Sequence, residues 1–179
     1  MGGIPAGIDR VFLAAVPDAD VAALIHHRAG ILRRAHHLDG RLIEPQGLHV
    51  SLFFLGGLPE RSLRMVYEAA AEVRTEPFEV SFDRTASFRS RSGHRPFVLF
   101  GDGGLRQLTS FRDMLGAALA RKGLGRRANT NFTPHVTLLY DMRDVEEHPI
   151  EPIGWTVREF VLIRSLHGHV YLGRWPLRS

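Results

Sequence analysis

The chain has no cysteine among its 179 residues, which excludes disulfide bonds, catalytic thiolates and cysteine-based zinc sites. It also has no apolar run of the length that a membrane span requires. The first ten residues, MGGIPAGIDR, lack the basic region and long apolar stretch of a secretion signal. We therefore expect a cytoplasmic protein. The net charge of +4 favours anionic partners only weakly, because such a charge is also common on inert surfaces.

What remains is the composition of an ordinary globular protein, with 44% hydrophobic and 23% charged residues. The length predicts one domain over residues 1–179. Apolar patterns with period two predict strands, and patterns with helical spacing predict three helices between them. The predicted strands outside the motifs described next are 9–16, 77–88, 96–101, 152–164 and 168–175, and the predicted helices are 18–37, 59–74 and 103–121.

Two short tetrapeptides carry most of the functional information: His49-Val50-Ser51-Leu52 and His135-Val136-Thr137-Leu138. Each lies in an apolar run that predicts a strand. Side chains alternate between the two faces of a strand, so each motif presents an imidazole and a hydroxyl on one face. Val50 and Leu52 in the first motif, and Val136 and Leu138 in the second, lie on the opposite faces, which we expect to pack in a core.

The two motifs occupy corresponding places in an imperfect internal duplication, in which strand, helix and histidine strand follow one another twice. The hairpin-like strands of the second half favour mixed or antiparallel sheets. We therefore predict an α+β fold of two pseudo-symmetric lobes. Each lobe is expected to hold a mostly antiparallel sheet with helices on its outer face, and the lobes to face a central cleft.

With both motifs placed, the chain resembles the 2H phosphoesterase superfamily, and within it the RNA 2′,3′-cyclic phosphodiesterases, also called 2′–5′ RNA ligases. The supporting segments run along the whole chain. They are Arg10–Ala14, Leu48–Gly56, Phe132–Leu138, Glu159–Leu162 and Arg174-Trp175. Ser51 stands where most members have threonine and keeps the hydroxyl.

The resemblance implies that His49 donates a proton to the leaving O3′ and that His135 is the base that activates water. Imidazole suits both tasks because its pKa lies near neutrality. Ser51 and Thr137 would bind the phosphate by donating hydrogen bonds to its non-bridging oxygens. The reaction needs no metal, and the resemblance implies no cofactor. The expected partner is RNA with a 2′,3′-cyclic phosphate end, or a cyclic nucleotide, without a membrane or an obligate protein partner.

Residues beside the motifs are candidates for binding the rest of the substrate. Tyr140, at a position that is often arginine in the family, and Phe132 flank the second motif and could stack on a base. Leu13 occupies a position near the substrate base where the family commonly has an aromatic residue. Phe53, Phe54, Phe97 and Phe100 are assigned to the core. Two basic loops could contact RNA phosphates or be solvated surface loops: Arg89, Arg91, His94 and Arg95 in one, and Arg126 and Arg127 in the other.

Two alternatives stay open from the sequence alone. One is another 2H-type cyclic nucleotide phosphodiesterase with a different substrate. The other is a non-catalytic nucleotide-binding module that uses the same cleft. Intact histidines and hydroxyls in both motifs argue against the second, because a binding module has no need of a matched acid and base.

Overall fold

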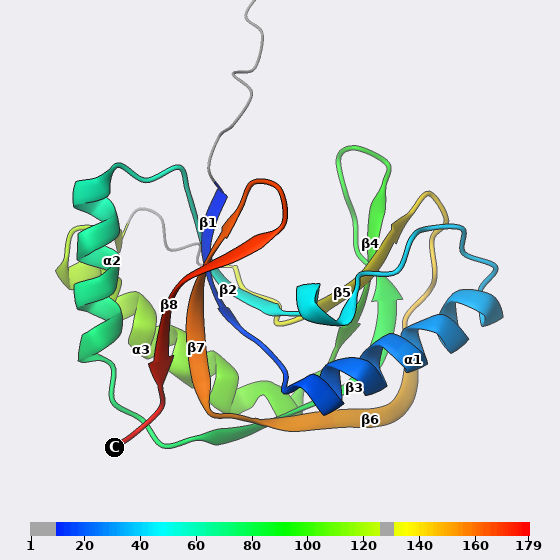
Figure 1. Ribbon diagram of the computed structural model, residues 1–179. Coiled ribbons are helices and arrows are strands. Elements are labelled where there is room, and N and C mark those ends of the chain that lie inside the picture. The colour runs from blue at the N-terminus through cyan, green and yellow to red at the C-terminus, as the bar shows by residue number, and fades with distance from the viewer. Residues whose placement is uncertain (1–9, 126–130) are drawn as a thin grey trace, which may run out of the picture.

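The computed structural model describes residues 10–125 and 131–179, and in these residues eight strands and three α-helices form an α+β fold (Figure 1). The predicted pair Arg126-Arg127 lies outside the described residues. Two short 3₁₀ turns, η1 and η2, complete the list of elements. In chain order these are β1 Arg10–Ala15, α1 Ala19–Ala35, η1 Pro45–Gly47, β2 Val50–Gly56, α2 Glu60–Glu72, β3 Phe78–Ser87, β4 Arg95–Phe100, η2 Gly103–Leu105, α3 Arg106–Arg121, β5 Val136–Asp141, β6 His148–Val157, β7 Glu159–Ser165 and β8 His169–Pro176.

The eight strands form one sheet in the order β6-β3-β4-β5-β2-β1-β7-β8, and their pairs are antiparallel. The two histidine strands, β2 and β5, meet in the middle through the single residue pair Val50 and Val136. The sheet therefore consists of two four-stranded halves joined at one point. This arrangement confirms the predicted α+β architecture of two facing halves.

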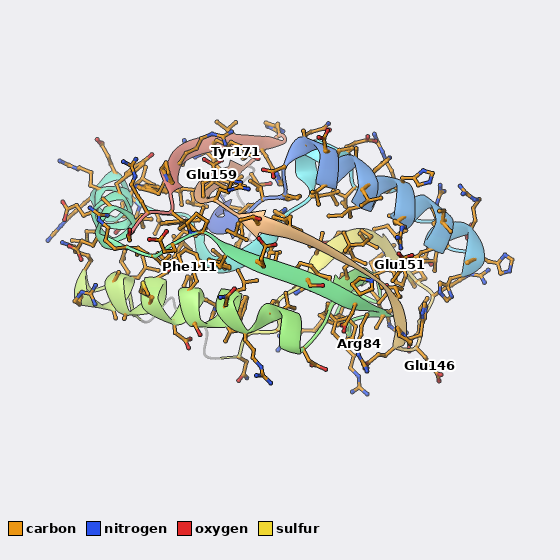
Figure 2. All side chains as sticks on the ribbon, turned by 90° about the horizontal axis from the view of Figure 1, so that it is seen from below. Arg84, Phe111, Glu146, Glu151, Glu159 and Tyr171 are labelled. Atoms are coloured by element: carbon orange, nitrogen blue, oxygen red, sulfur yellow. The ribbon has the colours of Figure 1, made fainter. Side chains whose placement is uncertain are left out.

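Helices α1 and α3 each contact the half of the sheet that does not contain the strand before them, whereas α2 packs on α3 and on β8 of its own half. Helix α1 follows β1 but packs against β6, and its C-cap residue His36 contacts Phe97 of β4. Helix α3 follows β4 and contacts β3 of the same half, and it also reaches β7, where Phe111 meets Phe160. Figure 2 labels Phe111 on this helix. Among the described residues, no helix is long and apolar enough to cross a membrane. The large hydrophobic core joins the helices to the sheet and includes Val50, Leu52, Val136 and Leu138 of the motifs, whereas the motif histidines and hydroxyls lie outside it.

The prediction of one continuous strand over residues 152–164 was wrong, because the chain turns at Arg158. Val157 ends β6 in a pair with Phe78 of β3, whereas Glu159 begins β7 in a pair with Pro176 of β8. The segment therefore crosses from one half of the sheet to the other. No glycine or proline marks this corner, so the apolar pattern continues through it. The other predicted strands and the three helices are confirmed, with small shifts at their ends.

A β-bulge interrupts strand β2 just after its hydroxyl residue. Leu13 of β1 pairs with Phe53, but the next residue, Ala14, pairs with Ser51, so that Leu52 is the extra residue. Leu52 and Phe53 are consequently both buried, although simple alternation places them on opposite faces.

Strand β5 has the same bulge at the same place in its motif. Phe97 pairs with Leu139 and Val98 with Thr137, which leaves Leu138 as the extra residue. Beyond the two bulges, Phe54 and Tyr140 turn outward and are 59% and 52% exposed. The prediction that Phe54 belongs to the core was therefore wrong.

Each bulged leucine leaves a carbonyl without its usual partner in the ladder, and each carbonyl is satisfied from outside the strand. The Leu52 carbonyl accepts a hydrogen bond from Nε of the buried Arg112 on α3, at 2.8 Å. The Leu138 carbonyl accepts one from the backbone N–H of Ile43, also at 2.8 Å. Each bulge is therefore stabilised by a hydrogen bond from a distant part of the chain.

Candidate active site

The motifs meet in an open cleft of about 790 Å³ on the face of the sheet opposite the large core. Five of the six predicted site residues line it: His49, Ser51, His135, Thr137 and Tyr140. The other lining residues come from the segment before β2 and from the β7–β8 hairpin. They are Ile43, Glu44, Gln46, Gly47, Gly168, His169 and Tyr171.

His49 stands at the start of β2 with both ring nitrogens engaged. Its Nδ1–H donates to the Gly47 carbonyl at 2.8 Å, so in the neutral ring Nε2 carries the lone pair. The Ser51 hydroxyl lies 3.1 Å from that Nε2 and donates to it in this state. When Nε2 is protonated, the bond reverses, and the Ser51 hydroxyl hydrogen is free to turn toward a ligand.

His135 repeats part of this arrangement on β5. Its Nδ1–H donates to the carbonyl of Thr133, two residues earlier, at 2.8 Å. The neutral ring therefore also carries its lone pair on Nε2, which is the atom that a general base uses. The ring packs edge-to-face on Phe88, with 5.2 Å between ring centroids.

The surroundings of His49 disfavour its charged form. Burial lowers the pKa of His49 most strongly, and the neighbouring His169 and His135 lower it further, while the hydrogen bond to the Gly47 carbonyl opposes the shift. The ring also packs against Phe12 at 4.9 Å between centroids. In the free protein, His49 is therefore biased toward the neutral state.

The segment from Asp39 to Gly47, which precedes β2, forms one wall of the cleft. Asp141 of β5 holds the start of this segment in place. The Asp141 Oδ2 accepts the backbone N–H groups of Asp39 and Gly40, at 2.7 and 2.8 Å. A hydrogen bond from the Arg143 backbone N–H lowers the pKa of Asp141 most, and the bonds from Gly40 and Asp39 lower it further, while burial opposes the shift. The segment lies so close to β5 that a Cβ on Gly40 would be 2.1 Å from the Tyr140 carbonyl oxygen. Only glycine fits there.

The structure gives Phe132 a different place from the predicted one. Phe132 does not line the cleft; its ring lies under the Arg112 guanidinium, 4.2 Å from ring centroid to Cζ, and packs against the core. Phe53 lies against the same guanidinium at 4.3 Å. Phe132 thus packs against the buried Arg112, whose Nε–H donates a hydrogen bond to the carbonyl of the bulged Leu52.

The expectation for Leu13 was also wrong. Leu13 is fully buried in the core on the helix side of the sheet. Its neighbour Phe12 points the other way and touches the His49 ring. The residue of this strand that contacts a motif histidine is therefore Phe12 rather than Leu13.

Sequence reasoning missed His169 and Tyr171, which line the cleft from β8. The spacing of two along a strand places both on one face. Nothing local links them to the motifs, because β8 reaches the site only through β7 and β1.

The chain belongs to the 2′–5′ RNA ligase superfamily, whose sequence model matches residues 16–169. Among similar curated proteins is the RNA 2′,3′-cyclic phosphodiesterase of Escherichia coli, 29% identical over 183 residues, covering 94% of this chain and 96% of that protein. The protein of the same name from Archaeoglobus fulgidus is 29% identical over 130 residues, 72% of this chain and 70% of its own. The predicted family is therefore confirmed, and these relatives support hydrolysis of cyclic phosphates.

Solved structures agree with this. E. coli LigT complexed with 3′-AMP superposes with a TM-score of 0.77 at 25% identity and covers 97% of this chain and 100% of its own. A crystal structure described as a phosphoesterase gives a TM-score of 0.78 at 25% identity with the same coverage.

Proposed function

We propose that this protein hydrolyses the 2′,3′-cyclic phosphate at the end of an RNA to a 2′-phosphate, and that His49 and His135 are its acid and base. The observation that carries the proposal is the meeting of both motifs in one cleft, with each imidazole oriented by a backbone carbonyl two residues earlier. Fixed orientation of this kind is what acid–base catalysis requires.

In the proposed step, His135 Nε2 takes a proton from a water molecule as its oxygen attacks phosphorus. The bond from phosphorus to O3′ breaks on the opposite side, and His49 Nε2–H gives its proton to O3′. The products are a free 3′-hydroxyl and a 2′-phosphate. The two histidines end with their protonation states exchanged, and solvent returns them.

The hydroxyls of Ser51 and Thr137 contribute hydrogen bonds to the non-bridging oxygens, where charge develops in the transition state. Both line the cleft beside the histidine of their own strand. Neither hydroxyl has to act as a nucleophile.

This mechanism asks His49 to be protonated, although burial and its imidazole neighbours favour the neutral ring in the free protein. The anionic phosphate resolves the conflict, because a negative charge beside an imidazole raises its pKa. Substrate binding therefore raises the pKa of His49, so that its ring is protonated when O3′ leaves.

The same site can also join RNA ends, when an RNA 5′-hydroxyl replaces water as the nucleophile and a 2′–5′ linkage forms as the bond from phosphorus to O3′ breaks. His135 and His49 keep their roles in this reaction, His135 as the base on the 5′-hydroxyl and His49 as the acid for O3′. They exchange roles only when the linkage is cleaved back to the cyclic phosphate. Water at its bulk concentration competes with any RNA end, so we expect hydrolysis to dominate.

The test is hydrolysis of the four nucleoside 2′,3′-cyclic phosphates and of a short RNA with such an end, in the presence of EDTA. Phosphorus NMR identifies the position of the product phosphate. Release of a 2′-phosphate that is lost in His49→Ala and in His135→Ala supports the proposal. Saturable binding without turnover of any substrate overturns it and favours a binding module.

A further inference from the structure

The cleft is poor in positive charge for a site that holds a phosphate. Of the described residues that line it, none is arginine or lysine, and Glu44 is acidic. Three imidazoles line it instead, those of His49, His135 and His169. The non-bridging oxygens of a phosphate diester share a negative charge and accept several hydrogen bonds. The proposed mechanism assigns them only the two hydroxyls of the motifs.

His169 is placed where it can add a donor. It begins β8 directly after the turn at Gly168, whose backbone φ of +110° suits glycine. Its ring lies edge-on to His49, with 5.2 Å between centroids, and edge-on to Phe12 at 5.6 Å. Tyr171, on the same face of β8 and labelled in Figure 2, also lines the cleft.

The nitrogens of His169 differ from those of the two motif histidines. Each motif histidine gives its Nδ1–H to a backbone carbonyl. Within residues 10–125 and 131–179, by contrast, the structure shows no hydrogen bond from either ring nitrogen of His169. A neutral imidazole always keeps one N–H donor. The His169 donor is therefore available to a ligand in the cleft.

We propose that His169 is a third substrate-binding imidazole, which donates a hydrogen bond to a non-bridging oxygen of the phosphate held between His49 and His135. The proposal rests on the proposed function, because it uses the same phosphate position. His49 uses Nε2 for the leaving oxygen, so the Ser51 hydroxyl is the donor from that strand to the non-bridging oxygens, and a neighbouring imidazole adds a second donor on that side. His169 is the cleft residue whose ring contacts His49 directly.

A packing role for His169 is the competing account, since its ring could simply hold His49 in place. Two substitutions separate the roles. His169→Phe keeps a ring against His49 and Phe12 but removes the N–H, whereas His169→Gln keeps an N–H donor and removes the ring. His167→Phe is the matched control, because His167 is an exposed residue of the same turn that does not line the cleft.

The probe is adenosine 2′-monophosphate, with binding measured by isothermal titration calorimetry. We expect His169→Phe to weaken binding by about tenfold or more, as loss of a hydrogen bond to a charged group does. His169→Gln is expected to lose less than about threefold, and the control to bind like the parent protein. KM for a cyclic nucleotide should follow the same order.

Normal binding by His169→Phe overturns the proposal, whether or not His169→Gln is impaired. A parent protein that does not bind adenosine 2′-monophosphate overturns it as well. Because binding is measured without turnover, these outcomes are independent of the proposed function. Failure of the proposed function shows instead as absence of hydrolysis by a parent protein that still binds the nucleotide.

Discussion

The two histidine strands, β2 and β5, share a local structure but not an environment. In both, an imidazole Nδ1 is fixed by the carbonyl two residues earlier, at 2.8 Å. In both, a hydroxyl follows two residues later and a bulged leucine comes next. The strands therefore supply the same parts to the cleft in the same order.

The differences begin at the side chains around each ring. His49 is enclosed by Phe12 and His169 and contacts the Ser51 hydroxyl, and burial lowers its pKa. His135 packs only on Phe88 among the described aromatic rings. A duplicated backbone thus places two equivalent imidazoles, and unequal surroundings prepare them for unequal roles. The predictions below test how far that division holds.

The largest effect is expected when either imidazole is removed. His49→Ala and His135→Ala should each lower kcat by roughly 10²- to 10⁴-fold, because each deletes a general acid or base. Steady-state kinetics on a nucleoside 2′,3′-cyclic phosphate measures the loss, and circular dichroism checks the fold. If only one variant is impaired, the two strands do not share the reaction.

Removal of the hydroxyls should have a smaller effect. Ser51→Ala and Thr137→Val should each lower kcat on the order of 10²-fold, the typical loss of one donor to a developing charge. The exchanges Ser51→Thr and Thr137→Ser keep the hydroxyl and serve as controls that retain most of the activity. Equal losses in the controls would indicate that packing, rather than the hydroxyl, is responsible.

The lowered pKa of His49 predicts a particular pH dependence. As proton donor, His49 must be charged, so kcat/KM should fall about tenfold per pH unit once the pH rises above its pKa in the free protein. That decline should begin below the ordinary histidine value. The same limb in kcat should lie at higher pH, because bound phosphate raises the pKa. Profiles of both parameters test this, and coincident alkaline limbs contradict it.

The smallest effects concern the aromatic residues beyond the bulges. Tyr140 lines the cleft and Phe54 does not, although both are exposed at equivalent positions. Tyr140→Ala should raise KM by about fivefold or more if the ring stacks on a base. Phe54→Ala is the matched control, with KM changed less than about twofold. A similar change in both variants would mean that neither ring contacts substrate.

Alternation along the strands was enough to predict the α+β fold and the positions of both histidines and both hydroxyls, because period two holds up to the bulge. Alternation no longer predicted the faces correctly for the residues that follow each bulge. The extra residues Leu52 and Leu138 reverse the faces, which is why Phe54 is exposed. The bulges depend on Arg112 and Ile43, which satisfy their carbonyls from distant parts of the chain.

The other failures are also tertiary in origin. The corner at Arg158 has no glycine or proline, and only the pairing of β6 with β3 and of β7 with β1 reveals it. His169 enters the site through strand order rather than through a motif. Phe132 lies outside the cleft because its ring packs against the buried guanidinium of Arg112.

The central claim is that the two equivalent strands carry out different proton transfers of one reaction, with His135 as the base and His49 as the acid. The most direct measurement uses a cyclic substrate in which sulfur replaces O3′, since a thiolate leaves without being protonated. We predict that His49→Ala regains most of the parent rate on this substrate, while His135→Ala stays impaired on both. Rescue of His135→Ala instead, or of neither variant, would contradict the assignment of His49 as acid and His135 as base.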